Sequence, residues 1–166
     1  QFQNTNQNKN TIYKRTHQDL LYESVYAHDL PCMADIDSSL LYFCREVSKS
    51  HKVVLTGECA DEVFGGYPWF HREEFLKSNT FPWTPSLTPR QSLLSGSLLD
   101  ALQMEKYVQK IYDTSVSEIA VLPTEDEIES NRHRIGYLNI RYFMQTLLNR
   151  MDRTSMHSSL EARVPF

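Results

Sequence analysis

Three carboxylates follow a Thr-Gly pair at the end of a short apolar run. Residues 53–67 read VVLTGECADEVFGGY, in which Thr56 and Gly57 precede Glu58, Asp61 and Glu62. In open α/β sheets, ligands bind beyond the carboxyl ends of the strands, where the next helix presents unpaired N–H groups. Gly57 allows a ligand to approach the backbone closely, and the Thr56 hydroxyl donates or accepts a hydrogen bond. The segment therefore predicts the floor of a nucleotide site.

The carboxylates themselves would repel bare phosphates, so such a site requires a divalent cation or a cationic group of the substrate between the two. Oxygen ligands together with phosphates suit Mg²⁺. A second interpretation stays open, in which these residues only stabilise the first turn of a helix. Acidic side chains are favoured there because they are attracted to the positive end of the helix dipole. Likewise, Gly65 and Gly66 are consistent with a simple helix stop.

Two helices and one strand are expected to lead into this segment. The first helix is predicted to be capped by Thr16 and to end near Asp29, before a break at Pro31. The second is predicted to start at Asp35 or Asp37 and to end near Lys49, with a buried face of Leu40, Leu41, Cys44 and Val47. Residues 52–56 follow as a strand covered on both faces by helices.

This strand is the one convincing strand of the chain, and it is predicted to lack neighbours. Unpaired backbone groups along two edges favour association, so we expect residues 53–55 to pair with a second copy or to be covered by a helix. Two long helices are predicted beyond the Pro-rich residues 81–89. One spans about Ser97–Val121; the other begins with a capping box of Thr124 and Glu127 and continues toward Arg150. Its buried face is predicted to contain Tyr137, Ile140, Tyr142, Phe143, Leu147 and Leu148.

Composition and charge narrow the class of protein. The 166 residues are 40% hydrophobic, which is ordinary for one globular domain, and we predict a disordered end or linker over 1–12 and a partial domain over 13–166. A net charge of −4 argues against a nucleic acid partner. No stretch is apolar enough to cross a bilayer and no signal peptide opens the chain, so a cytoplasmic location is predicted. The cysteines Cys32, Cys44 and Cys59 are widely spaced thiols, and Cys59 is interpreted as a packing residue.

Two segments of the chain resemble a known family. Residues 56–67, TGECADEVFGGY, resemble the S-G-E-G-A-D-E-x-F-G-G-Y motif of the asparagine synthetase family, with Thr56 in place of Ser and Cys59 in place of Gly. Residues 150–166, RMDRTSMHSSLEARVPF, resemble its D-R-x-S-M-x-x-x-x-E-x-R-x-P-F-L-D block. The resemblance implies an α/β fold of the adenine nucleotide alpha-hydrolase-like (ATP pyrophosphatase) type, of which this chain is a mostly helical piece.

The resemblance also implies a reaction and its site. In that family, ATP activates aspartate as an aspartyl-adenylate, and ammonia that a glutaminase domain releases from glutamine displaces AMP. By motif, Thr56 and Gly57 would contact the nucleotide, and Glu58 would lie by the adenylate where ammonia attacks. Asp61 would bind Mg²⁺ or the amino group of the substrate. The motif assigns no comparably clear role to Glu62.

The second segment supplies further candidates, which either shape the pocket or form a buried ion network that orients the last helix. The ion network is the favoured interpretation for Asp152, Arg153, Glu161 and Arg163. Glu62 is grouped with them as pocket support. Tyr67, Pro68 and Trp69 either line the rim of the pocket or pack inside the fold.

One departure from the family bears on activity. The S-G-G-x-D-S pyrophosphate loop of the family occurs nowhere in the sequence, so the chain by itself is expected to be inactive. A glutaminase domain in a longer parent chain and a second copy of the chain are the expected protein partners. The alternatives are an adenylating relative with another acceptor, such as a β-lactam-forming synthetase, and a non-catalytic helical interaction module.

Overall fold

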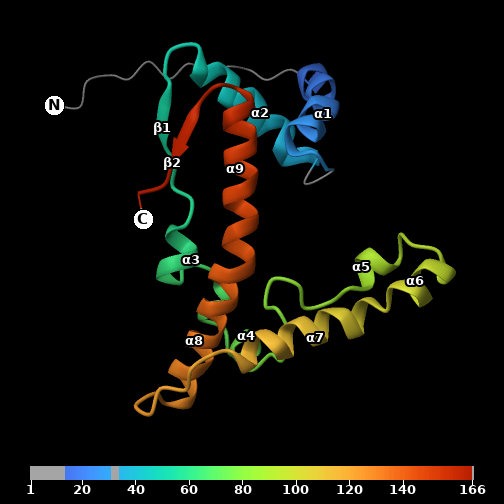
Figure 1. Ribbon diagram of the computed structural model, residues 1–166, viewed down its shortest axis with the longest axis vertical. Coiled ribbons are helices and arrows are strands. Elements are labelled where there is room, and N and C mark those ends of the chain that lie inside the picture. Colours follow the sequence, from blue (N-terminus) through green and yellow to red (C-terminus); the bar gives the residue numbers. More distant parts are fainter. Residues whose placement is uncertain (1–13, 31–33, 166) are drawn as a thin grey trace. The chain divides into compact units, whose positions relative to one another are not determined.

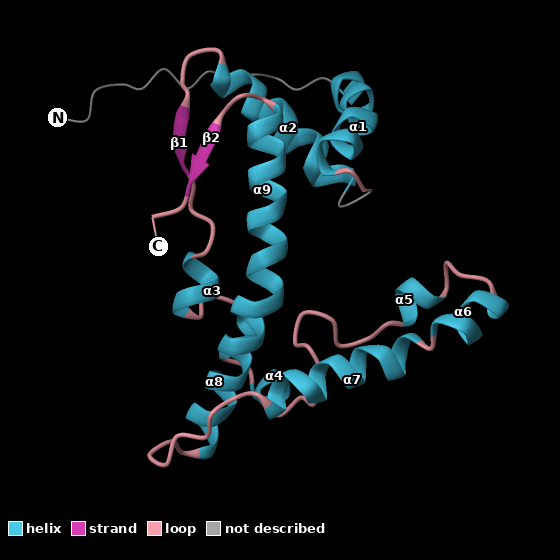
Figure 2. Ribbon diagram, viewed as in Figure 1, coloured by secondary structure: helices cyan, strands magenta, loops and turns pink. Residues whose placement is uncertain are grey.

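Helices account for most of the described chain, as the sequence predicts (Figure 2). The computed structural model describes residues 14–30 and 34–165, so the predicted linker, Pro31 and Cys32 lie outside the described residues. In chain order the elements are α1 Lys14–His28, α2 Ala34–Ser48, β1 Val53–Leu55, α3 Ala60–Phe64, the 3₁₀ helix η1 Pro68–Phe70, α4 Glu73–Leu76, α5 Thr88–Gln91, α6 Gly96–Leu102, α7 Met104–Ser117, α8 Glu127–Leu138, the π-helical segment η2 Asn139–Met144, α9 Gln145–His157 and β2 Glu161–Arg163. None of the helices among the described residues combines the length and the apolar character needed to cross a membrane.

The described residues form two units, each of which is described by itself. Residues 14–57 and 148–165 make the first unit, and residues 58–147 make the second. The first therefore holds α1, α2, the two strands and most of α9, while the second holds α3 to α8 and the π-helical segment (Figure 1). The chain passes from one unit to the other between Gly57 and Glu58, inside the acidic segment.

Helices α1 and α2 pack against each other through the periodic apolar residues that predict them. Leu20 of α1 and Leu41 and Cys44 of α2 are buried. Glu23 of α1 forms an ion pair with Arg45 of α2. The predicted cap is wrong, because Thr16 lies inside α1, which begins two residues earlier.

A parallel pair of strands, β1 and β2, corrects the prediction of a single strand. Val53 pairs with Glu161 and Leu55 with Arg163. Neither a second copy nor a covering helix is therefore needed to pair this side of β1. The predicted burial on both faces is also wrong, since the Val53 and Leu55 side chains are 44% and 72% exposed.

A tight turn after α9 makes the second strand possible. The Ser159 backbone adopts a left-handed conformation with φ 55°. The Leu160 N–H then donates to the Ser155 carbonyl at 2.9 Å, and the Leu160 side chain is buried. The chain is turned back in this way, and the Glu161 N–H donates to the Lys52 carbonyl at 2.8 Å, which sets the register of β2 on β1.

Both long helices predicted for the second unit are interrupted or displaced. The first is broken at Gln103, whose left-handed backbone (φ 45°) separates α6 from α7. The second starts later than predicted, because the side chain of Asp126 caps it by accepting a hydrogen bond from the Glu129 N–H at 2.9 Å. Asp126 and Glu129 thus occupy the cap and third helical positions predicted for Thr124 and Glu127.

The face that α8 and the π-helical segment bury differs from the prediction, because the residues it buries most deeply were not predicted and the predicted ones are at most half-buried. Ile135, Leu138 and Asn139 are buried, whereas Ile140 is 43% exposed. Tyr142 and Phe143 are half-buried, as is Tyr137. A π-helical turn widens the repeat beyond 3.6 residues, so a face predicted from α-helical spacing is displaced within it.

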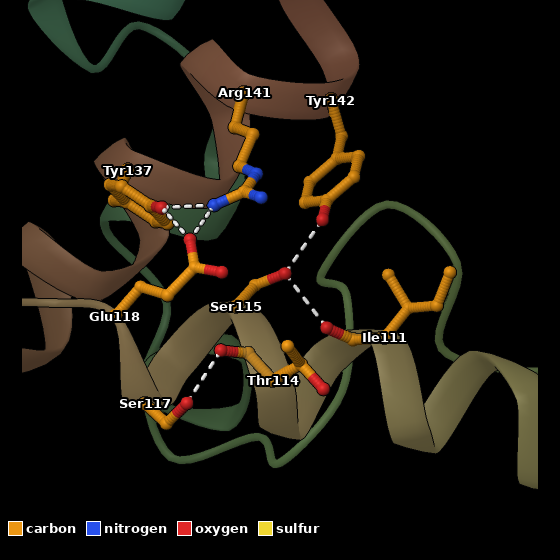
Figure 3. Close-up of polar contacts among 8 residues, drawn as sticks. All are labelled: Ile111, Thr114, Ser115, Ser117, Glu118, Tyr137, Arg141 and Tyr142. Carbon is orange, nitrogen blue, oxygen red and sulfur yellow. Dashed lines mark hydrogen bonds and ion pairs between the residues drawn. The ribbon is translucent and has the colours of Figure 1, made fainter.

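Polar contacts with α7 hold α8 and the π-helical segment in place (Figure 3). The Ser115 hydroxyl donates to the Ile111 carbonyl at 2.7 Å, so the Tyr142 hydroxyl donates to Ser115, at 2.6 Å. Beyond the end of α7, Glu118 accepts a hydrogen bond from Tyr137 at 2.9 Å and forms an ion pair with Arg141. These two contacts lower the pKa of the exposed Glu118 carboxyl, and that from Arg141 has the larger effect.

Candidate functional site

Thr56 and Gly57 follow β1 directly, and Thr56 is hydrogen-bonded to the end of β2. The Thr56 N–H donates to the Arg163 carbonyl at 2.9 Å, which extends the ladder between the strands by one residue. The Thr56 hydroxyl oxygen is shielded from solvent and has no hydrogen-bond partner in the part of the chain that the structure describes. At Gly57 an added Cβ would meet no heavy atom of residues 14–30 or 34–165 within 4 Å, which leaves the backbone open to a ligand on that side.

The acidic residues differ in their relation to the short helix α3, whose five residues follow the left-handed Cys59. Glu58 precedes the helix and is half-buried, so the prediction that it lies in the first turn is wrong. Cys59 has φ 76°, a conformation that favours glycine and costs other residues about 1–2 kcal/mol. This strain occurs at the position where the motif named above has Gly, which gives a physical reason for glycine there.

Glu62 lies inside the fold and is not a surface residue of a pocket. Its side chain is 2% exposed, and its carboxylate accepts a hydrogen bond from the Tyr67 hydroxyl. Its backbone carbonyl accepts a hydrogen bond from the Asn139 amide at 3.4 Å. Because Asn139 is fully buried at the start of the π-helical segment, these contacts anchor α3 against that segment.

Asp61 is the exposed carboxylate of the group. The helix ends at Gly65, whose left-handed backbone (φ 72°) directs its N–H to the Asp61 carbonyl. The Gly66 N–H donates to the same carbonyl at 3.0 Å. The Asp61 side chain then lies over Gly66, where an added Cβ would be only 2.8 Å from the carboxyl carbon.

The pKa values of two neighbouring groups report the negative potential of the three carboxylates. Burial raises the pKa of the Cys59 thiol, and the charges of Glu62 and Glu58 raise it further. Burial and the hydrogen bond to Glu62 raise the pKa of Tyr67 well above its ordinary value, to which the charges of Glu62, Asp61 and Glu58 add. A buried thiol with a raised pKa is a poor nucleophile, which agrees with the interpretation of Cys59 as a packing residue.

The aromatic residues after the glycine pair pack together with the π-helical segment. Tyr67 stacks on Trp69 with ring centroids 4.3 Å apart, and both rings meet the edge of Phe143 at 5.4 Å. Trp83 completes this cluster at 5.3 Å from Phe143. Packing is therefore the role that the structure gives Tyr67 and Trp69, whereas Pro68 is exposed.

No group of three His, Cys, Asp or Glu side chains among residues 19–30 and 36–165 is arranged to hold a metal ion. The Glu62 carboxyl is turned inward to Tyr67, whereas Asp61, for which the motif implies Mg²⁺ or the substrate amino group, is exposed. Mg²⁺ is commonly bound by one or two carboxylates together with substrate phosphates. Asp61 offers one exposed carboxylate of this kind.

The second segment does not form the predicted buried ion network. Asp152 is exposed on α9, and Glu161 and Arg163 form an exposed ion pair of 2.8 Å with each other on β2. Arg153 forms an ion pair with Asp29 and donates to the His28 carbonyl at 3.2 Å, so it ties the end of α1 to α9. The backbone of this segment carries its structural role, because β2 pairs with the strand that leads to Thr56.

Sequence reasoning missed two residues that shape the site. Asn139 contacts Glu62 from the π-helical segment, and no local pattern in the sequence indicates that contact. The sequence pattern makes Gly65 and Gly66 together a helix stop, but the left-handed residue that ends α3 is Gly65. A helix stop requires only one glycine, so the second glycine indicates a separate role for Gly66.

The comparisons with known proteins agree with the resemblance. The family model described as asparagine synthase matches residues 4–166. The chain is 46% identical over 162 residues, or 98% of its length, to asparagine synthetase [glutamine-hydrolyzing] 3 of Bacillus subtilis (strain 168), and 29% identical over 81% of its length to asparagine synthetase [glutamine-hydrolyzing] 1 of the same organism. It spans about a quarter of each relative, 26% in both cases.

Proposed function

Because this chain belongs to the asparagine synthase family, we propose that it forms part of an ATP-dependent enzyme that converts aspartate to asparagine. The reaction proceeds through an aspartyl-adenylate, and the ammonia that completes it comes from glutamine. The glutaminase that supplies this ammonia is a further domain of a longer chain. A cytoplasmic location is part of this proposal.

One observation carries the proposal: the strand pair β1 and β2 joins the two segments that resemble the family. The backbone bond from Thr56 to Arg163 places the end of β1 beside the second segment. At that end, the shielded Thr56 hydroxyl lacks a partner among the described residues and the Gly57 backbone is open. Both features suit a nucleotide, whose phosphate and ribose oxygens accept or donate hydrogen bonds and whose approach requires the absence of a side chain.

The three acidic residues have different roles in the proposed site, and these roles follow from how exposed each side chain is. Asp61, the exposed carboxylate, holds Mg²⁺ together with phosphate oxygens. A Mg²⁺ ion held there would supply positive charge to the phosphates. Glu58 is half-buried and lies beside the carbonyl that ammonia attacks, where it accepts a proton. Glu62 supports both residues from inside the fold through its contacts with Tyr67 and Asn139.

An exchange assay tests the proposed function directly. The complete protein that contains this chain is expected to catalyse exchange of labelled pyrophosphate into ATP only when aspartate is added, because adenylation is reversible. The 166-residue chain is expected to give no exchange, since its sequence holds no S-G-G-x-D-S loop to stabilise the transferring phosphates. Exchange by the complete protein with another carboxylate in place of aspartate would favour an adenylating relative with a different acceptor. A complete protein without any exchange would support the non-catalytic alternative.

Glu58→Ala separates the two halves of the reaction. In the complete protein we expect this variant to keep aspartate-dependent exchange within about threefold, while asparagine formation falls by about 100-fold, because general base catalysis contributes on that order. The two rates are measured on the same preparation. Loss of ATP affinity with an unchanged ratio of the two rates would assign Glu58 a structural role.

A further inference from the structure

The two glycines after α3 have different physical roles. Gly65 has a positive φ of 72°, so its role is conformational, and an added Cβ there would lie in ordinary contact with Phe70 at 3.4 Å. Gly66 has no such backbone requirement. An added Cβ at Gly66 would nevertheless lie 2.8 Å from the carboxyl carbon and 3.2 Å from the Cβ of Asp61, and closer still to a carboxylate oxygen. The absence of a side chain at Gly66 is therefore what leaves room for the carboxylate.

The segment around this contact is held too firmly to move away from it. Glu62, the next residue after Asp61, is buried and bound through its side chain to Tyr67 and through its carbonyl to Asn139. Both glycine N–H groups donate to the Asp61 carbonyl, which fixes the main chain on either side of the contact. The Asp61 side chain is exposed and has no hydrogen bond or ion pair among the described residues, so the closest contacts at Gly66, those with the carboxyl group, would be relieved by rotation of that side chain.

We propose that Gly66 is a positioning residue for the Asp61 carboxylate. The missing Cβ makes room for the observed orientation of the Asp61 side chain. The anchored helix α3 fixes the direction in which the carboxylate then points. A methyl group at Gly66 moves the carboxylate without unfolding the helix. This inference rests on the function proposed above, in which the Asp61 carboxylate takes part in the reaction.

Gly66→Ala in the complete protein tests the proposal. The rate of asparagine formation is expected to fall by about 10–100-fold, the usual cost of disturbing a residue that orients a metal ligand. The Mg²⁺ concentration for half-maximal rate is expected to rise, while glutamine hydrolysis and the melting temperature stay unchanged. Gly96→Ala is the matched control. Gly96 also has no positive φ, but a Cβ there would meet no heavy atom of the described residues within 4 Å. A variant that fails to fold would overturn the proposal, since it predicts an intact fold.

A double-mutant cycle with Asp61→Asn shows whether Gly66 acts through Asp61. The double variant is expected to be no slower than the slower single variant, because the second change has no carboxylate left to displace. Fully additive losses would overturn the proposal. A crystal structure of Gly66→Ala supplies a readout independent of activity, and an unchanged Asp61 rotamer there would overturn the proposal as well. If Asp61→Asn alone leaves the rate unchanged, the function proposed for Asp61 fails, and the crystal structure still decides whether Gly66 positions it.

Discussion

Asp61→Asn is expected to lower asparagine formation by the complete protein by about 100-fold or more while glutamine hydrolysis continues at its normal rate. An amide has nearly the size of the carboxylate but lacks its charge, and Mg²⁺ prefers charged oxygen ligands. Charge stabilisation of this kind is commonly the largest single contribution to catalysis. The substitution is on an exposed residue, so the free energy of unfolding is expected to change by less than about 0.5 kcal/mol.

The measurement compares the two half-reactions and includes a matched control. Asparagine and glutamate are quantified in the same assay at saturating Mg²⁺, so that a loss of synthetase activity is distinguished from a loss of glutaminase activity. Asp100→Asn makes the same chemical change at an exposed position on α6, and its rates are expected to stay normal. Normal asparagine formation by Asp61→Asn would remove Asp61 from the site.

Gly57→Ala is expected to weaken binding of ATP to the complete protein by about tenfold or more, which corresponds to about 1.4 kcal/mol. The described residues accommodate the methyl group, because a Cβ at Gly57 meets none of their heavy atoms within 4 Å and the backbone there has no positive φ. The methyl group would therefore obstruct a ligand that approaches the backbone at the end of β1. The effect is therefore expected in the KM for ATP and not in the melting temperature.

Isothermal titration with ATP and a melting curve give the two quantities separately. Gly96→Ala again serves as the control, since its Cβ also meets open space but lies on α6. Equal ATP affinity in the Gly57 variant and the parent would show that the nucleotide does not contact this backbone. A lowered melting temperature with normal affinity would assign Gly57 a structural role.

The three carboxylates of the acidic segment illustrate why residue type alone does not assign roles. They lie within five residues, yet one is half-buried, one is exposed and one is fully buried. Of the three, Asp61 has the most exposed side chain. The buried Glu62 carboxyl accepts a hydrogen bond from the Tyr67 hydroxyl, so it stabilises the position of α3.

The sequence by itself determined the local elements and the segment where chemistry is expected. Apolar spacing predicted α1 and α2 within two residues at most ends, and it identified Leu41 and Cys44 as buried. The β-branched run of residues 53–55 predicted β1, and the Thr-Gly pair marked its end. These features depend on neighbours a few residues apart, which is the range over which helical and strand periodicity operate.

The sequence does not determine which of two equivalent residues begins or ends a helix. Thr124 and Asp126 are both good helix caps with a Glu three residues later, so the pattern supports either start. The structure selects Asp126. The break at Gln103 likewise has no Gly or Pro to announce it, because a non-glycine residue takes the left-handed conformation there.

Only the tertiary structure decided how the two family-like segments meet and which carboxylate is exposed. The three residues of β2, Glu161, Ala162 and Arg163, carry no strand pattern, and they form a strand because their backbone groups pair with β1. The Glu62 contact with Asn139 joins residues 77 positions apart, and the burial of Glu62 follows from it. Backbone pairing and burial depend on which surfaces come together in space, and spacing along the chain carries no record of that.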